Sequence, residues 1–108
     1  MKTTIYSEPI NKAVLANGRV YFSPADSDFF PSDSFGDRNT ETGGLKGKPV
    51  QILAGADMLL CDIRRISANR VGPRSSVKTW LKLAGIREGD VLQLTATGDR
   101  IYRLERKA

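Results

Sequence analysis

The sequence predicts one mainly β domain over residues 1–108, a closed or nearly closed small barrel of about seven strands. Three observations lead to this prediction. A chain of 108 residues suits a single domain with one core. Short segments of alternating polarity are separated by turn-forming glycine, asparagine and aspartate. A strong helical period occurs in one segment, around residue 80.

The first third of the chain predicts three elements. Thr3–Tyr6 is expected to form a short strand. Lys12–Ala16 and Arg19–Phe22 flank an Asn-Gly dipeptide, the strongest short signal for a β-hairpin, so a hairpin is predicted there. The stretch "SPADSDFFP" suits one helical turn, with Ser23 as its cap and Pro24 at the first helical position, ending before the next proline.

Two further hairpins and a long connection follow. Ser32–Lys48 shows little periodicity and reads as a connection, and connections of this length are commonly functional or disordered. "PVQILAGADMLLCDIRR" predicts a hairpin that turns at Ala54–Asp57, and Ile66–Arg74 is loop-like. "VLQLTAT" and "RIYRLE" alternate around Gly98-Asp99 and predict the last hairpin.

"SSVKTWLKLAGI" is the clearest helix. Its apolar residues recur at i, i+3, i+4 and i+7, namely Val77, Trp80, Leu81 and Ala84. Ser75 or Ser76 suits the N-cap, and Gly85 suits the left-handed C-terminal position. Trp80 is therefore expected in the core, and Glu88-Gly89-Asp90 as the turn that follows.

The composition argues against several classes of function. There are no histidines and one cysteine, which removes His/Cys metal sites and histidine-based catalysis. We therefore expect no enzyme activity from this chain alone, no metal and no cofactor. Cys61 reads as a buried thiol in a reducing compartment, so a cytoplasmic protein is expected. No apolar run is long enough for a membrane span, and the start lacks the apolar stretch of a secretion signal.

The charge is unevenly placed. Seventeen Lys and Arg against twelve Asp and Glu give a net charge of +5. Ile63–Arg87 carries seven basic residues and no acidic one, whereas Phe22–Asp37 carries four acidic residues and no basic one. Such a layout indicates a positive face, for which polyanions are a common partner. From charge alone, a nucleic-acid surface and a merely solvated one remain equally open.

Four segments together resemble a known family. They are "FFPSDSFGDRN", "CDIRR", "VGPRSSVKTWLKLAGIREGDVLQL" and "RIYRLE". In this order they resemble prokaryotic B-three-like DNA-binding domains of the DNA-binding pseudobarrel superfamily, with plant B-three domains and EcoRII-type effector-binding domains. The resemblance covers roughly Val20 to Glu105. It implies a mainly β fold, a seven-stranded open pseudobarrel with two short helices, which grips duplex DNA through two arms in the major groove.

By position, the resemblance places the first arm at residues 32–40 and the second arm at residues 66–76. Relatives often carry Gly-Gly where this chain has Gly36-Asp37, and Arg74 alone matches a pair of arginines in the second arm. The predicted base-reading residues are Ser34, Asp37, Arg38, Asn39, Asn69, Arg70 and Arg74. The predicted DNA-backbone contacts are Gly36, Lys46, Lys48, Arg64, Arg65, Ser75, Ser76 and Lys78.

Three side chains keep more than one interpretation. Asp33 suits either ordinary turn chemistry or a DNA contact. Phe35 suits an apolar anchor that pins the first arm to the barrel, or a contact to a thymine methyl group. Lys82 shares an outward stripe with Lys78 and suits either a phosphate contact or solvated surface, and the second is expected.

The predicted function is sequence-specific binding of double-stranded DNA by a monomer. The chain would be the recognition module of a restriction endonuclease, with a catalytic nuclease domain in a longer parent chain, or a stand-alone reader. One alternative is a dimeric swapped-hairpin repressor or antitoxin of the AbrB type, whose "Gly-Ile-x-x-Gly-Asp" strand is similar to "GIREGDVLQL". Another is a protein-interaction barrel with no nucleic-acid role.

Overall fold

The computed structural model describes residues 3–36, 48–65, 69–72 and 74–107. The strands are β1 (Thr4–Tyr6), β2 (Tyr21–Phe22), β3 (Phe35–Gly36), β4 (Val50–Ala54), β5 (Asp57–Arg65), β6 (Asn69–Gly72), β7 (Leu92–Gly98) and β8 (Ile101–Arg106). The helical elements are α1 (Lys12–Asn17), the 3-10 helices η1 (Pro24–Phe29) and η2 (Ser32–Ser34), and α2 (Arg74–Leu83).

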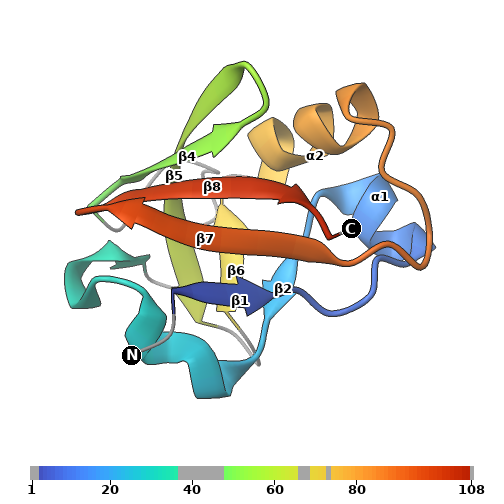
Figure 1. The fold of residues 1–108 in the computed structure, drawn as a ribbon. Coiled ribbons are helices and arrows are strands. Elements are labelled where there is room, and N and C mark those ends of the chain that lie inside the picture. The colour runs from blue at the N-terminus through green and yellow to red at the C-terminus, as the bar shows by residue number, and fades with distance from the viewer. Residues whose placement is uncertain (1–2, 37–47, 66–68, 73, 108) are drawn as a thin grey trace.

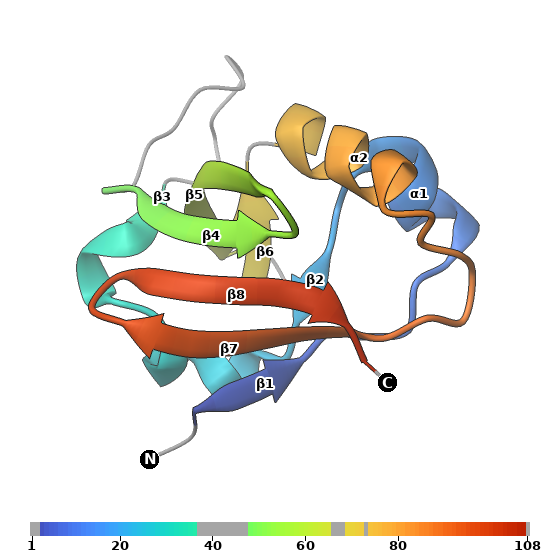
Figure 2. The ribbon, with the colours of Figure 1, turned by 45° about the horizontal axis from the view of Figure 1, so that its top comes forward.

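The eight strands of the described ranges form one nearly closed barrel. Their order is β1-β7-β8-β4-β5-β6-β2, with β3 beside β5. An isolated antiparallel bridge from Ser7 to Phe22 joins the two edges of this order, so the sheet curls back on itself. Helices α1 and α2 lie together at one end, away from η1 and η2 (Figures 1 and 2). The predicted mainly β, nearly closed barrel is confirmed.

The core follows the alternation of the strands. On β4, Val50, Ile52 and Ala54 point inward while the residues between them are exposed. The helix α2 covers one end of the barrel with Val77, Trp80 and Leu81, all buried. Fully burying an aliphatic or aromatic side chain contributes roughly 1.5–3 kcal/mol. The core position predicted for Trp80 is confirmed.

Aromatic side chains close the opposite end of the barrel. Phe30 lies at the centre of this group, with its ring centroid 5.4 Å from that of Phe29, 6.0 Å from that of Tyr102 and 6.3 Å from that of Phe35. Edge-on and tilted arrangements of this kind are the favoured ones. Phe35 packs against the core, which confirms the anchor interpretation of this residue.

The hairpin predicted around Asn17-Gly18 is wrong, because these residues end a helix. Asn11 caps α1 by accepting a hydrogen bond from the Val14 amide at 2.9 Å. Gly18 takes φ 68° at the C-terminal cap, and its N–H donates to the Val14 carbonyl at 2.7 Å. A hairpin turn and a helix C-cap both need positive φ, so Asn-Gly suits either.

Most other expected elements are confirmed. The β4–β5 and β7–β8 hairpins turn where expected, and Ser23 caps η1 by accepting from the Ala25 amide. The loop predicted at Ile66–Arg74 is wrong in part, because β6 lies within it. This four-residue strand pairs with β5 on one side and β2 on the other. Its shortness left too little alternation for the sequence to indicate a strand.

Candidate nucleic-acid interface

The strands β3 and β5 bring the two predicted arms to one edge of the barrel. They run parallel, with Phe35 opposite Ile63 and Gly36 opposite Arg64. Because parallel strands advance in the same direction, the chain passes Gly36 and the end of β5 at neighbouring points. Residues 37 and 66 therefore follow directly from adjacent strand ends, although they are far apart in sequence.

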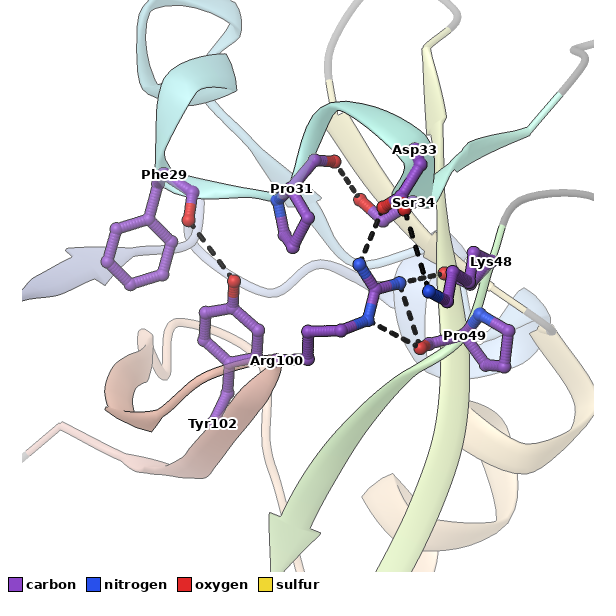
Figure 3. A network of polar contacts seen from close by, with 8 residues as sticks. All are labelled: Phe29, Pro31, Asp33, Ser34, Lys48, Pro49, Arg100 and Tyr102. Atoms are coloured by element: carbon purple, nitrogen blue, oxygen red, sulfur yellow. Dashed lines mark hydrogen bonds and ion pairs between the residues drawn. The ribbon is translucent and has the colours of Figure 1, made fainter.

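A polar group of four residues connects the two sides of residues 37–47 (Figure 3). It consists of Asp33, Lys48, Pro49 and Arg100, and we term it the Arg100 cluster. The Arg100 Nη1 donates to Asp33 Oδ1 at 2.6 Å, and its Nη2 donates to the carbonyl oxygens of Lys48 at 2.7 Å and Pro49 at 3.0 Å. The Lys48 amide also donates to the Asp33 carbonyl at 2.8 Å. The entry and exit of the segment are thus held together.

The charge of Asp33 is stabilised within this cluster. The hydrogen bond from Arg100 is the main cause that lowers the pKa of the Asp33 carboxyl, with further contributions from the positive charges of Arg100 and Lys48. The Lys48 ammonium lies 4.0 Å from Asp33 Oδ2 and its side chain is well exposed. Asp33 therefore has a partner inside the fold, and Lys48 remains accessible to a polyanion.

Two predicted base-reading residues are buried. Ser34 is fully buried, and its Oγ donates to the Pro31 carbonyl at 2.6 Å within η2. Asn69 is 1% exposed, and its Nδ2 donates to the Ser23 carbonyl at 3.0 Å and to Ser27 Oγ at 3.2 Å. These contacts indicate that both residues support the barrel near the arms.

Arg64, a predicted phosphate contact, is also buried. It is 3% exposed, and its Nε donates to the two carboxylate oxygens of Asp62 at 2.9 and 3.0 Å. The two residues share one face of β5 because strand side chains alternate. A buried pair of this kind holds local geometry, since removal of one partner leaves an uncompensated charge. Its position beside Gly36 indicates a supporting role under the first arm.

The second arm is divided by β6. This strand begins at Asn69, opposite Arg65, and ends at Gly72, opposite Asp62. Its length of about 10 Å therefore separates Asn69 from the residues that lead into α2. Arg70 lies half-buried on β6, while Ser76 is half-buried and Lys78 exposed on α2. The structure thus places the predicted contacts of the second arm in two groups. Asn69 and Arg70 lie on β6, whereas Arg74, Ser75 and Ser76 lie on α2.

Several predicted contacts lie outside the described residues, and they stay predictions: Asp37, Arg38, Asn39 and Lys46. For Arg65, Arg74 and Ser75 the structure describes the backbone only, at the end of β5 and the beginning of α2. Gly36 is described and ends β3.

Sequence reasoning missed Arg100. The sequence indicates that this residue follows the Gly98-Asp99 turn, and the structure gives it φ 60°, uncommon for a residue other than glycine. No signal in the sequence connects it with Asp33, 67 positions earlier. The pairing becomes visible only once the barrel brings the β7–β8 turn beside β4.

The described part of the chain contains no group of three or more Cys, Asp or Glu side chains that could hold a metal ion. None of the helices in these ranges has the length and apolar character needed to cross a membrane.

No family model matches the chain, and no curated protein does so either. Three chains of solved structures are similar to it, including the following two. The N-terminal domain of Helicobacter pylori LlaJI.R1 has a TM-score of 0.64 at 16% identity, with 97% of this chain and 81% of that chain covered. The hypothetical Arabidopsis thaliana protein At1g16640.1 has a TM-score of 0.59 at 11% identity, with 100% and 95% covered. This likeness concerns the fold alone.

Proposed function

We propose that this chain is a sequence-specific double-stranded DNA-binding module that places two arms in the major groove. The observation that carries the proposal is the parallel register of β3 and β5, with Gly36 opposite Arg64. Because of this register, the chain continues into residues 37–47 and 66–68 from adjacent strand ends. A two-armed grip on one groove requires such an arrangement. The basic character of Ile63–Arg87 supplies the attraction for phosphates.

The side chains assigned to base reading are those with the matching chemistry. Arg38, Arg70 and Arg74 suit bidentate pairing with guanine, Asn39 suits adenine, and Asp37 suits the cytosine amino group. Because Ser34 and Asn69 are buried, we assign them to the support of these arms in place of base reading.

A second set is assigned to the DNA backbone, where it sets affinity without reading sequence. Lys48 and Lys78 are exposed on the described surface. Lys46, Arg65, Ser75 and Ser76 are assigned with them by position. Gly36 lacks a side chain, which favours close approach of the duplex to the end of β3.

The resemblance of the sequence favours the recognition module of a restriction endonuclease, or a stand-alone reader, with no reaction carried out by this chain. A monomer is favoured by the barrel itself, because the Ser7–Phe22 bridge closes it within one chain. An AbrB-type dimer would instead build its barrel from two copies.

Selection from a randomised duplex pool tests the proposal. A defined short motif should be enriched, and binding to it should weaken steeply as salt rises, with a slope near −0.9 for each phosphate contacted. The matched control is a scrambled duplex of equal length and base composition. No enrichment, together with no shift of any duplex at ~50 mM salt, would contradict the proposal and favour a protein-interaction barrel.

The oligomeric state is tested separately by the mass in solution. A monomer mass, free and on DNA, is expected. A dimer mass at micromolar concentration would contradict the proposed monomer.

A further inference from the structure

We propose that Arg100 is a positioning residue, which fixes where the 37–47 segment leaves and rejoins the barrel and so sets how selectively the chain binds DNA. This inference rests on the proposed function. Arg100 lies on the turn between β7 and β8, outside both predicted arms. It would act through the residues that flank the first arm.

The contacts of Arg100 are divided between the two sides of the segment. Before it, Arg100 Nη1 donates to Asp33 Oδ1 at 2.6 Å. After it, Nη2 donates to the carbonyl oxygens of Lys48 and Pro49, and Nε donates to Pro49 at 3.3 Å. One planar guanidinium therefore holds Asp33 and Pro49 at a fixed distance from each other. The rigid fork of an arginine suits this role better than a lysine ammonium does.

The backbone of Arg100 is itself held in place. Its carbonyl accepts a hydrogen bond from the Gln51 amide at 2.9 Å, which ties the turn to β4. Two residues further on, the Tyr102 hydroxyl donates to the Phe29 carbonyl at 3.2 Å. A positive φ costs free energy for a residue with a side chain, and these contacts compensate for it. The turn is thus a firm support for the guanidinium.

The charge of Arg100 is already used within the protein. Its side chain is 21% exposed and pairs with the Asp33 carboxylate. A phosphate would have to displace that carboxylate to gain the same contact. Arg100 is therefore distinguished from Lys48 and Lys78, whose exposed ammonium groups suit direct phosphate contact.

Fixing the residues on either side of positions 37–47 lowers the ordering cost of binding. Contacts to base edges need side chains held in one geometry, whereas non-specific binding to phosphates tolerates many. Loss of the Arg100 contacts should therefore weaken binding to the selected duplex more than binding to a scrambled one.

The test compares three variants of the whole chain: Arg100→Ala, Arg100→Lys and Arg103→Ala. Arg103 lies on β8, is more than half exposed, and its loss removes the same charge away from the Arg100 cluster. For each variant, dissociation constants are measured for the selected duplex and for its scrambled control. Arg100→Ala should reduce the ratio between the two by about tenfold or more, comparable to the loss of one base contact.

The other two variants separate geometry from charge. Arg100→Lys keeps the charge but loses the fork, so it should lose most of the same selectivity. Arg103→Ala should weaken both duplexes slightly and equally. Asp33→Ala, an exposed change on the other side of the cluster, should lower the selectivity less than Arg100→Ala does, because Arg100 keeps its bonds to the Lys48 and Pro49 carbonyls. The double variant should be no worse than Arg100→Ala, because the contact that Asp33→Ala removes is already lost in that variant.

The outcomes also separate this inference from the function beneath it. If the wild-type chain selects no duplex, the proposed function fails. If it selects one, and both the folded Arg100→Ala and Asp33→Ala variants keep the full preference, only the positioning role fails. Thermal melting of each variant establishes that it is folded.

Discussion

Asn69 and Ser27 hydrogen-bond side chain to side chain across 42 positions of sequence, with 3.2 Å between Asn69 Nδ2 and Ser27 Oγ. A second bond from the same amide, to the Ser23 carbonyl, ties the beginning of β6 to η1. The strand that follows residues 66–68 is thereby fixed to the helix that precedes the first arm. The elements next to the two proposed arms are thus connected beneath the surface as well as along β5.

Asn69→Ala should lower the free energy of unfolding by about 1–3 kcal/mol, because the Ser23 carbonyl and Ser27 hydroxyl would lose a buried partner. Urea denaturation measures the change. The exposed Asn17, at the end of α1, supplies the control, and Asn17→Ala should change stability by about 0.5 kcal/mol or less. If Asn69→Ala is as stable as the wild type but shows a weaker preference among bases, Asn69 reads bases and the structural role is wrong.

Arg74→Ala should relax base choice at one position of the selected motif, since one bidentate contact accounts for roughly 1–3 kcal/mol of discrimination. Repeating the pool selection with the variant measures this effect. If Arg74→Ala merely weakens every sequence alike, the assignment of the second arm is wrong.

Lys78→Ala should weaken binding to all duplexes uniformly and reduce the salt slope by about one, as expected for a phosphate contact. Lys82, one turn further along α2 and also exposed, provides the matched control, and Lys82→Ala should leave the slope nearly unchanged. Titrations at several salt concentrations measure both. Equal slopes for the two variants would mean that α2 does not approach the DNA backbone at Lys78.

The contribution of Asp33 to stability should depend on pH. Because the pKa of the folded Asp33 is lowered, the unfolded chain binds the proton more readily, so the stabilisation is fully present above about pH 4 and is lost as pH falls through the lowered value. The melting temperatures of the wild type and Asp33→Ala should therefore differ at pH 7, and the difference should shrink as pH falls below about 4. A constant difference across this range would show that the Asp33 charge is not what Arg100 stabilises.

Cys61 should be inert in the folded protein. Burial, with the neighbouring Asp62 charge, raises the pKa of its thiol to about 12, and its side chain is fully buried. The reactive thiolate is therefore nearly absent at pH 8. A thiol reagent should label Cys61 only as fast as the chain unfolds, and addition of urea should speed the labelling. Rapid labelling without denaturant would contradict the buried position.

The sequence predicted those parts of the fold that rest on local chemistry. Alternating strands around glycine turns, the Ser23 cap and the helix with Trp80 all follow from patterns within about ten residues. The Asn17-Gly18 error had a local cause too, since the same positive φ serves a hairpin and a helix end. What decided between them was the Asn11 cap and the packing of Val14 against the core.

The candidate site was less predictable, because burial and distant pairing decide it. Ser34 and Asn69 look like exposed polar groups in the sequence, yet both are enclosed by the barrel. Arg100 looks like an ordinary turn residue, yet it contacts Asp33 and Lys48, on the two sides of residues 37–47. Residues 37–39 carry the most suggestive base-reading chemistry, and they lie outside the described ranges.

The direct bond from the Lys48 amide to the Asp33 carbonyl has a use in protein engineering. It joins the two sides of residues 37–47 through backbone atoms alone, so it does not depend on the side chains between them. Libraries of varied length and composition could be grafted between Gly36 and Lys48 on an unchanged scaffold. New target preferences could then be sought by exchanging only the residues between Gly36 and Lys48, without any change in the hydrophobic core.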